Sequence, residues 1–371
     1  MSKSITSSAI IRMTLLCVLA LSILGVANAQ QPEQPDLTID AATRTQVIDG
    51  ILKRLNDSYV FPETAKKMEQ SIRERVAKKE YDQITSAKQF ATKLTTDLQD
   101  VSHDKHLRVR YSDRSIPERG PQREPTAEER EQRKRDLNWS NHGFSKVERL
   151  RGNIGYLEFV NFMDEELGAD TVAAAMNFVA NTDALIIDMR NNGGGNPAMV
   201  ALVCSYLFGP DPVHLNDLYW REGNRTDEFW TRKEVAGKRY LNKDVYVLTS
   251  KRTFSGAEEF TYNLKNLKRA TIIGETTGGG AHPGGVFRIN EHFGMFVPTG
   301  RAISPITKTN WEGTGVTPDI SVPADQALLV ARSMALKKQL TSVTDSDIKA
   351  GIQDEIAKVE KELNALKTKS E

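Results

Sequence analysis

The chain of 371 residues has little cysteine. It contains only Cys17 and Cys204, so at most one disulfide is possible, and none remains if Cys17 is removed with a leader. Cys204 lies in an apolar run, which favours a buried small side chain, although a reactive thiol is the open alternative. Without disulfides, a chain of this length must be stabilised by its hydrophobic core.

Neither positive nor negative charge predominates, because the chain has 50 Lys and Arg residues and 49 Asp and Glu residues. Loss of Lys3 and Arg12 with a leader would change the formal net charge from +1 to about −1. A second long apolar run is also missing. We therefore expect no nucleic-acid partner, and no membrane span once the leader is removed.

The N-terminal residues have the pattern of an export signal. Lys3 and Arg12 supply positive charge, Met13 to Val26 is an apolar run too short for a comfortable membrane span, and Ala27-Asn28-Ala29 is a small-x-small cleavage site. We expect residues 1–29 to be a signal peptide. The protein should then be exported to a periplasm or outside the cell.

The composition changes several times along the chain, from helical periodicity to charged residues and then to alternating strands and helices. The last helix carries apolar residues at heptad spacing, from Ile352 to Leu366. That seam packs on its own domain or forms a homo-oligomer. The predicted segments are a signal peptide (1–29), a disordered lead-in (30–38), an N-terminal helical domain (39–111), a charged linker (112–143), an α/β core (144–325) and C-terminal helices (326–371).

The core repeats one pattern of strand, turn and helix. Ala184 to Asp188 is an apolar strand of the kind buried on both faces of a sheet, and a glycine turn and a helix follow it. The same succession recurs from Val245 to Leu267. This pattern predicts an α/β layered domain.

Ser255 lies where the second of these strands gives way to a helix. A serine at such a corner can present its hydroxyl at the carboxyl edge of the sheet, beside free N–H groups of the first helical turn. A nucleophile and an oxyanion site are therefore possible here. The alternative is that Thr253 or Ser255 only caps the helix, with Glu258 favourable in its first turn.

Two glycine runs flank this corner in the sequence. Gly193-Gly194-Gly195 lets a backbone lie against a ligand, and it matches neither the dinucleotide nor the phosphate-loop pattern. Gly278-Gly279-Gly280 follows a strand without a helix after it and is interpreted as a flexible loop that lines a site. His103 and His106 lie at the domain junction, where either could join a site or be an ordinary surface histidine. No His, Cys, Asp and Glu set has ligand spacing, so we expect no metal and no cofactor.

Four ordered motifs resemble those of the tail-specific, or C-terminal-processing, serine peptidases. The similarity covers about residues 40 to 325 and includes the branch of the interphotoreceptor retinoid-binding protein modules. It implies a ClpP/crotonase-like core, with Ser255 as the nucleophile. The motifs are Asp188-x-Arg190-x-Asn192-Gly193-Gly194-Gly195, Thr253-x-Ser255-Gly-Ala-Glu258, Gly274-Glu-x-Thr277-Gly-Gly and Glu312-Gly-x-Gly315-Val-x-Pro318-Asp319.

The resemblance also implies which residues activate the serine. One branch of the family uses a lysine at the position of Gly279 or Gly280, where this chain has none. Another branch, resembling tricorn proteases, uses a histidine and a glutamate, which match His106 and Glu312. His106 would take the serine proton and Glu312 would orient the imidazole. His103 and His282 are the rival bases.

The remaining site residues follow from the chemistry of acyl transfer. An oxyanion needs backbone donors, and the N–H of Gly256 with that of Gly193 or Gly194 would provide them. Gly279, Gly280 and His282 are predicted to contact substrate.

The interval between the helical domain and the core is too short for the PDZ domain of many relatives. We therefore expect an exported serine endopeptidase that hydrolyses unfolded proteins or short peptides. The alternative is a non-catalytic module that binds an apolar ligand in the cleft.

Overall fold

The computed structural model describes residues 35–118 and 126–370. The predicted signal peptide and most of the predicted lead-in lie outside the described residues. Within the described ranges, no helix is both long and apolar enough to cross a bilayer.

Three helices follow the lead-in, as the periodicity predicts: α1 (Ala41–Ser58), α2 (Pro62–Ala77) and α3 (Ala87–Ser102). The side chains of Asp40 and Ser86 accept backbone N–H groups at the starts of α1 and α3. Proline at the first position of α2 sacrifices no helical hydrogen bond. The apolar stripes of the helices share one core, which contains Val47, Ile51, Leu55, Met68, Ile72, Phe90 and Leu94.

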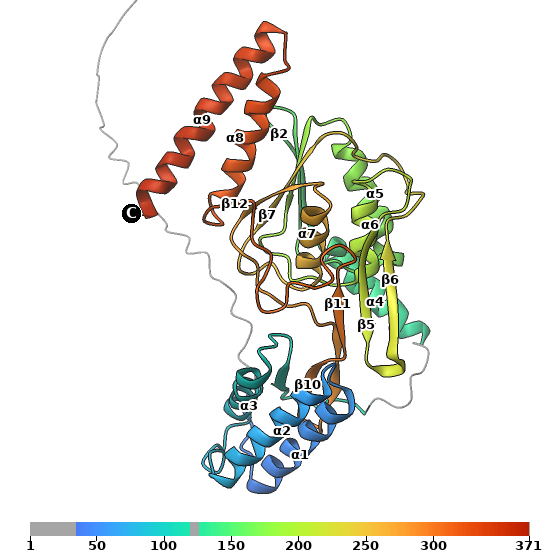
Figure 1. The fold of residues 1–371 in the computed structure, drawn as a ribbon, viewed down its shortest axis with the longest axis vertical. Coiled ribbons are helices and arrows are strands. Elements are labelled where there is room, and N and C mark those ends of the chain that lie inside the picture. The colour runs from blue at the N-terminus through green and yellow to red at the C-terminus, as the bar shows by residue number, and fades with distance from the viewer. Residues whose placement is uncertain (1–34, 119–125, 371) are drawn as a thin grey trace, which may run out of the picture. The chain divides into compact units, whose positions relative to one another are not determined.

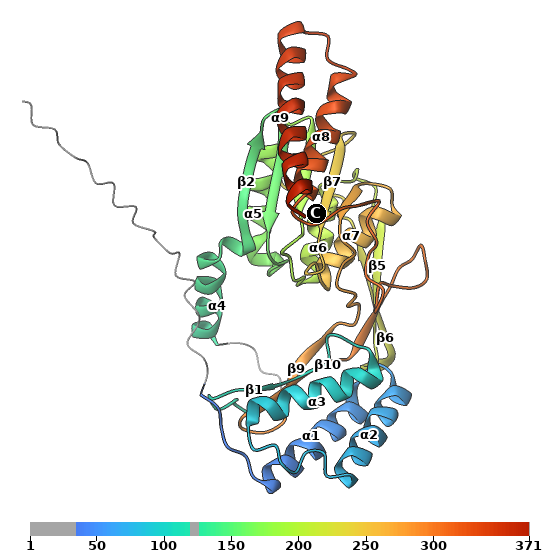
Figure 2. The ribbon, with the colours of Figure 1, turned by 90° about the vertical axis from the view of Figure 1, so that its left-hand side faces the viewer.

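A hairpin from the later sequence packs on these helices. Strands β9 (Gly284–Arg288) and β10 (Phe293–Pro298) pair antiparallel, and β10 also pairs with β1 (Arg108–Tyr111). Phe293 and Met295 are buried in the core of the helices, and Figure 2 shows the hairpin lying along them. The hairpin therefore belongs by packing to the N-terminal helices. It thereby brings the histidine just before β1 close to the loops of the α/β part.

The central sheet has the strand order β12-β8-β7-β4-β3-β2. β2 is antiparallel to β3, and the other neighbours are parallel. Parallel strands place their carboxyl ends at one edge of the sheet, where their loops meet. The strands are β2 (Phe144–Leu150), β3 (Ile154–Phe159), β4 (Ala184–Asp188), β7 (Asp244–Thr249), β8 (Thr271–Gly274) and β12 (Ile320–Ser321).

Helices cover both faces of this sheet (Figure 1). Leu185 and Ile187 of β4 face the layer of α5, α6 and α7, whereas Ala184 and Ile186 face α8. This alternation explains why the strand is apolar throughout. The helices are α5 (Glu165–Val179), α6 (Pro197–Ser205), α7 (Gly256–Asn266), α8 (Ala327–Leu340) and α9 (Ser346–Ser370).

Cys204 lies in α6 and is fully buried in the core between the sheet and the helices. Burial raises the pKa of its thiol. The side chain is therefore the small hydrophobic group that its apolar neighbours predict.

Two parts of the fold differ from the expectation. The charged linker contains a helix, α4 (Ala127–Trp139), that buries no residue; a capping box of Thr126 and Glu129 stabilises its start. A sheet of order β11-β5-β6 was not predicted as a unit, because its three strands come from two distant stretches. Its strands are β5 (His214–Trp220), β6 (Arg225–Trp230) and β11 (Gly300–Ile303), and short 3₁₀ turns lie at Asn141–Gly143 and Glu222–Asn224.

The heptad seam of α9 packs within the chain. Ile352 and Val359 are buried against α8, and Arg332 of α8 pairs with Glu355 at 2.5 Å. The seam therefore has an intramolecular partner. A homo-oligomer through this helix stays a prediction.

Candidate active site

Ser255 stands at the corner between β7 and α7. It is partly exposed and has φ 55°, a conformation that costs a non-glycine residue roughly 1–3 kcal/mol. Its backbone N–H donates to the carboxylate of Glu258 at 2.9 Å, which ties the corner to the first turn of α7. Serine nucleophiles occupy sharp turns of this kind because the turn exposes the hydroxyl at the edge of the sheet. A simple helix cap needs no such backbone conformation.

Glu258 is a fully buried carboxylate that accepts hydrogen bonds from two segments. Besides the Ser255 N–H, it accepts from Gly279 N at 2.6 Å, from Gly280 N at 2.8 Å and from the Thr277 hydroxyl. Burial raises the pKa of Glu258, and these hydrogen bonds oppose the rise. Glu258 therefore fixes the nucleophile corner to the second glycine loop. Sequence reasoning treated it only as a favourable first-turn residue.

The second glycine loop is internal, which contradicts its interpretation as a flexible, substrate-lining segment. Gly279 and Gly280 are buried, and both N–H groups are engaged by Glu258. Their carbonyls accept from Gly313 N at 3.2 Å and from the Trp311 indole at 2.7 Å. The backbone of these glycines is thus unavailable to a substrate. The predicted substrate contact of these glycines stays a prediction, which their engaged backbone groups do not support.

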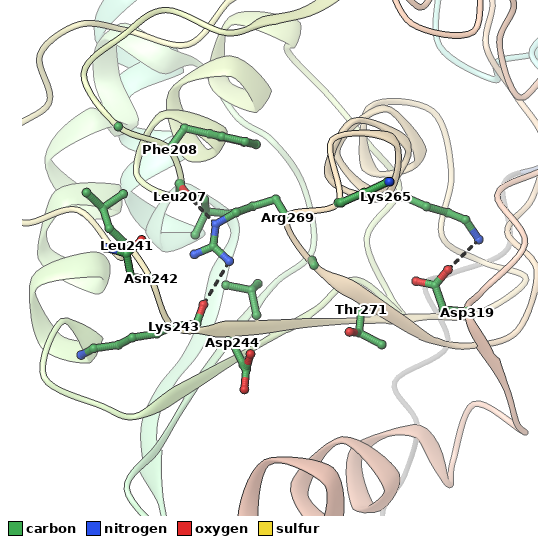
Figure 3. A pocket seen from close by; sticks show the side chains of 14 residues that line it. Leu207, Phe208, Leu241, Asn242, Lys243, Asp244, Lys265, Arg269, Thr271 and Asp319 are labelled. Atoms are coloured by element: carbon green, nitrogen blue, oxygen red, sulfur yellow. Dashed lines mark hydrogen bonds and ion pairs between the residues drawn. The ribbon is translucent and has the colours of Figure 1, made fainter. Parts of the chain in front are cut away.

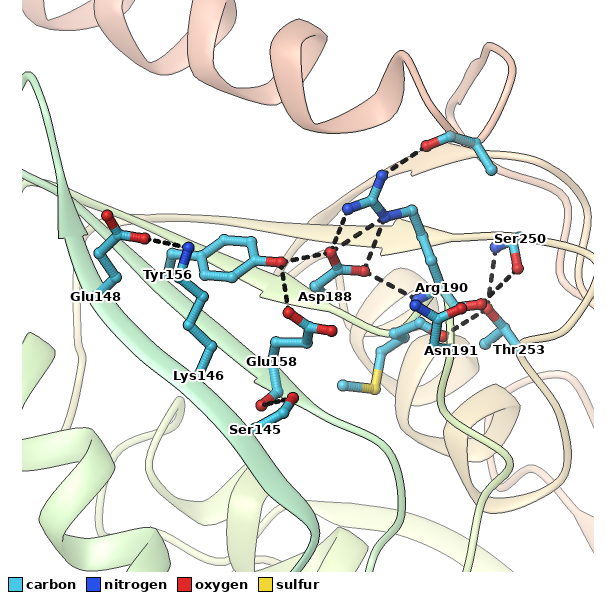
Figure 4. Close-up of polar contacts among 12 residues, drawn as sticks. Ser145, Lys146, Glu148, Tyr156, Glu158, Asp188, Arg190, Asn191, Ser250 and Thr253 are labelled. Atoms are coloured by element: carbon cyan, nitrogen blue, oxygen red, sulfur yellow. Dashed lines mark hydrogen bonds and ion pairs between the residues drawn. The ribbon is translucent and has the colours of Figure 1, made fainter. Parts of the chain in front are cut away.

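Side chains just before Ser255 hold the loop after β4 against the Ser255 corner. The Thr253 hydroxyl donates to Met189 O at 2.8 Å, and the Ser250 hydroxyl donates to Arg190 O at 2.5 Å. Figure 4 shows these contacts beside the ion pair of Arg190 with Asp188. The Asp and Arg of the first motif therefore position the loop and are remote from the serine's own chemistry.

The oxyanion prediction needs a correction. Gly193 N donates to Val160 O at 3.0 Å and Gly194 N donates to Asn192 Oδ1 at 2.8 Å, so neither N–H is free. Within the described ranges, no acceptor engages the N–H of Gly195 or Gly256. A Cβ on Gly256 would lie 2.9 Å from Gly195 N, so these two glycines are in contact. Nothing in the sequence distinguishes Gly195 from the two glycines before it.

His106 lies in the turn before β1, where its backbone N–H donates to Asp104 at 3.0 Å. Its ring centroid lies 4.5 Å from that of Phe254, the residue before Ser255, and 5.7 Å from that of Phe296. Burial lowers the pKa of His106 to about 4, so the imidazole is neutral near pH 7. No hydrogen bond joins it to the Ser255 hydroxyl in the described chain. The structure thus places this histidine beside the serine corner.

Gly280 makes room for this histidine. A Cβ at Gly280 would lie 2.7 Å from His106 Cε1 and 2.3 Å from the Phe254 ring. A lysine at this position, as in the other branch of the resemblance, would compete with the imidazole for the same space.

Glu312 approaches the same imidazole from the late glycine loop. Its Oε2 accepts from Ala281 N at 2.5 Å, whereas its Oε1 is buried without a hydrogen-bond partner. His106 Nδ1 is likewise buried and unpartnered. One side-chain atom each from Asp104, His106 and Glu312 lies within 4.8 Å of the others. Burial and the neighbouring Asp104 raise the pKa of Glu312 to about 7.

His282 and Asp104 complete a buried cluster. His282 Nδ1 lies 2.7 Å from Asp104 Oδ2, and the Tyr59 hydroxyl donates to the same oxygen at 3.1 Å. His282 is buried, so its predicted contact with substrate stays a prediction that this burial does not support. His103 is exposed at the end of α3. Asp104 was missed; its place two residues before His106 was the only signal.

The cluster contains nitrogen and oxygen atoms of the kinds that can bind a divalent cation. However, the carboxylate of Asp104 already accepts hydrogen bonds. Its carboxylate accepts from the His106 backbone, from His282 and from Tyr59. Charge and hydrogen bonding within the cluster therefore account for this arrangement of side chains.

A hollow of ≈ 680 Å³ lies at the amino ends of β7 and β8, the edge of the sheet opposite to the Ser255 corner. Arg269 donates to backbone carbonyls there, and Lys265 pairs with Asp319 at 3.0 Å (Figure 3). Its cations are largely committed to the fold, and its charged lining does not suit an apolar ligand. The polar residues of this hollow are Asn242, Lys243, Asp244, Lys265, Lys268, Arg269, Thr271 and Asp319.

Comparison with known proteins identifies family models that match this chain. The model of peptidase family S41 matches residues 153–322, and that of the N-terminal domain of peptidase S41 in eukaryotic IRBP matches residues 39–137. Carboxyl-terminal-processing peptidase 2, chloroplastic, of Arabidopsis thaliana is 28% identical over 177 residues. That match covers 46% of this chain and only 32% of the relative.

Solved structures share the fold at low sequence identity. A lipoprotein from Streptococcus agalactiae has a TM-score of 0.54 and 18% identity, and a candidate peptidase from Parabacteroides merdae has a TM-score of 0.53 and 16% identity. Each match covers 79% of this chain and 96% of the other. The two S41 models together match most of the chain and identify its family. The chain belongs to peptidase family S41.

Proposed function

We propose that this protein is a serine peptidase that cleaves unfolded proteins or short peptides through an acyl-enzyme on Ser255. One observation carries the proposal: the strained Ser255 corner lies against the neutral imidazole of His106, which in turn lies beside the carboxylate of Glu312. A serine hydroxyl needs such a base, because it is almost wholly protonated near pH 7. Export to a periplasm or the exterior remains part of this proposal.

The reaction then follows the usual course of acyl transfer. His106 takes the hydroxyl proton while Ser255 Oγ bonds to the peptide carbonyl carbon. The imidazolium returns this proton to the leaving amine as the C–N bond breaks. Water, deprotonated by the same histidine, hydrolyses the ester and frees the serine. No cofactor takes part in these steps.

Two unpartnered atoms indicate how the imidazole is oriented. His106 Nδ1 and Glu312 Oε1 are buried without partners in one cluster. A hydrogen bond between them would satisfy both, and it would stabilise the imidazolium that forms during attack. Catalytic hydrogen bonds often tighten only when substrate binds. We therefore assign Glu312 as the orienting carboxylate.

The oxyanion is assigned to one expected donor, the N–H of Gly256, and to the N–H of Gly195 in place of that of Gly193 or Gly194. The N–H groups of Gly195 and Gly256 are free and belong to contacting residues, whereas those of Gly193 and Gly194 are engaged. Loss of one such donor typically costs about 3–4 kcal/mol of transition-state stabilisation.

Cleavage of an unfolded protein tests the proposal. The full chain should degrade reduced, carboxymethylated casein, and Ser255→Ala should abolish this activity while remaining folded by circular dichroism. Ser342→Ala, which changes an exposed serine after α8, is the matched control and should cleave at the wild-type rate. Casein left intact by folded wild-type protein that instead binds retinol would favour the apolar-ligand alternative.

A further inference from the structure

A buried carboxylate–imidazole pair adjoins the candidate triad and has no part in the steps above. His282 Nδ1 is 2.7 Å from Asp104 Oδ2 and 3.5 Å from Glu312 Oε2. An ionised carboxylate can only accept, so Nδ1 carries the proton and donates to Asp104. Two carboxylates therefore lie within 3.5 Å of one ring nitrogen of His282.

The carboxylates of Asp104 and Glu312 lie close together in this buried cluster. Like charges this close disfavour each other's ionised form, and burial adds to the cost. Asp104 and burial raise the pKa of Glu312 to about 7, and His282 opposes this rise. An orienting carboxylate must be ionised to stabilise an imidazolium. Any group that favours the ionised form of Glu312 beside Asp104 therefore also supports His106.

Few other charged groups face this pair. The phenol of Tyr59 donates to Asp104, and the Phe61 ring lies against His282, with its centroid 5.2 Å away. Arg301 lies over that Phe61 ring, 5.7 Å from the centroid. The remaining titratable groups that face Glu312 or His106 are Tyr59, Glu258 and Arg108.

We propose that His282 is a positioning residue that acts through Glu312, an inference that rests on the proposed function. Its Nδ1 lies 2.7 Å from Asp104 and 3.5 Å from Glu312, and this donor favours the ionised form of Glu312 that is available to His106. Without this donor, the nearby carboxylate of Asp104 would disfavour the ionised form of Glu312 more strongly. Glu312 would then be neutral when His106 needs it.

Reactivity of Ser255 toward a fluorophosphonate tests the proposal in the full chain. We expect His282→Ala to slow labelling at least tenfold at neutral pH and to move the acidic limb of the pH profile upward. His282→Asn keeps a donor near Nδ1 and should retain most of the reactivity. The double variant Asp104→Asn/His282→Ala removes the competing carboxylate, and it should label faster than His282→Ala alone.

A purely structural role predicts the opposite order. Loss of both members of a buried pair would then leave the double variant no better than His282→Ala, with an unchanged acidic limb. That result would overturn the proposal. His292→Ala is the matched control, because this half-buried histidine contacts the Ser112 carbonyl, the Tyr111 ring and its own neighbours in the β9–β10 hairpin, none of which belongs to the cluster of Asp104, His282 and Glu312. It should label at the wild-type rate.

A second readout does not depend on activity. A carboxyl with a raised pKa binds more protons in the folded chain than in the unfolded chain, so stability falls as pH rises from near 4.5 through the folded pKa. Between about pH 5 and pH 8, the melting temperature of His282→Ala should therefore fall more steeply than that of Asp104→Asn/His282→Ala. Both variants lack the imidazole, so its own titration cancels. Parallel curves would refute the proposal even if the chain cleaves nothing.

Discussion

Replacing His106 by alanine should lower kcat/KM for peptide cleavage on the order of a thousandfold or more, because general-base catalysis contributes about 10²–10⁴. The loss should be mainly in kcat, because the imidazole acts on the proton that moves in the transition state. A fluorogenic peptide series measured for wild type and variant gives both constants. The folded state should be checked by circular dichroism, since the ring also packs between Phe254 and Phe296.

The rival histidines supply the controls for this experiment. His103→Ala changes an exposed side chain at the end of α3 and should leave kcat/KM unchanged. A large loss in His103→Ala, with activity preserved in His106→Ala, would contradict the assignment of the base.

Replacing Glu258 by glutamine should impair both stability and reactivity. Each carboxylate oxygen accepts from two donors: Oε1 from Thr277 and Gly279, and Oε2 from Ser255 and Gly280. An amide NH₂ at Oε2 would face two backbone N–H donors and lose both bonds. At Oε1 it would lose the bond from Gly279, whereas the Thr277 hydroxyl can turn to accept from the amide. At about 1.5 kcal/mol or more for each charge-assisted bond lost, the free energy of unfolding should fall by roughly 1.5–3 kcal/mol.

The same change should slow the reaction by about a hundredfold where the variant is still folded, because misplacement of a reacting group by ~1 Å has that cost. Denaturant unfolding and labelling at low temperature separate the two effects. Glu128→Gln, in the exposed first turn of α4, is the matched control and should change neither. A stable Glu258→Gln variant with full reactivity would show that Glu258 does not hold the corner.

Local sequence patterns were sufficient for much of the fold. Apolar periodicity identified α1, α3 and α9, and a fully apolar run identified β4 as a strand covered on both faces. The packing of the β9–β10 hairpin on the N-terminal helices was not visible in these patterns. Pairing of β10 with β1 depends on residues more than 180 positions apart, and local periodicity carries no information on such contacts.

The site was predictable to a different degree for each residue. The motifs singled out Ser255, His106 and Glu312, and the structure places them around one cluster, although their roles remain proposals. Backbone donors could not be chosen, because the state of the Gly193 and Gly194 N–H groups depends on Val160 and Asn192. Sequence spacing does not reveal which N–H groups are engaged by other acceptors of the chain.

His282 shows the same limit for a side chain. A histidine in a glycine-rich loop suggests contact with substrate, but its partner Asp104 is 178 positions away and buries it. The second glycine loop was misjudged for a related reason. Glycine indicates where a backbone can bend, whereas the three hydrogen bonds from this loop to Glu258 hold its backbone in place.

The most direct test of the account is whether Ser255 is an activated nucleophile. The wild-type chain, Ser255→Ala and His106→Ala would each be treated with a fluorophosphonate probe, and mass spectrometry would locate the adduct. We predict one adduct on Ser255 in wild type and none in either variant. A folded wild-type chain that stays unlabelled, or one that carries the adduct on another residue, would contradict the central claim.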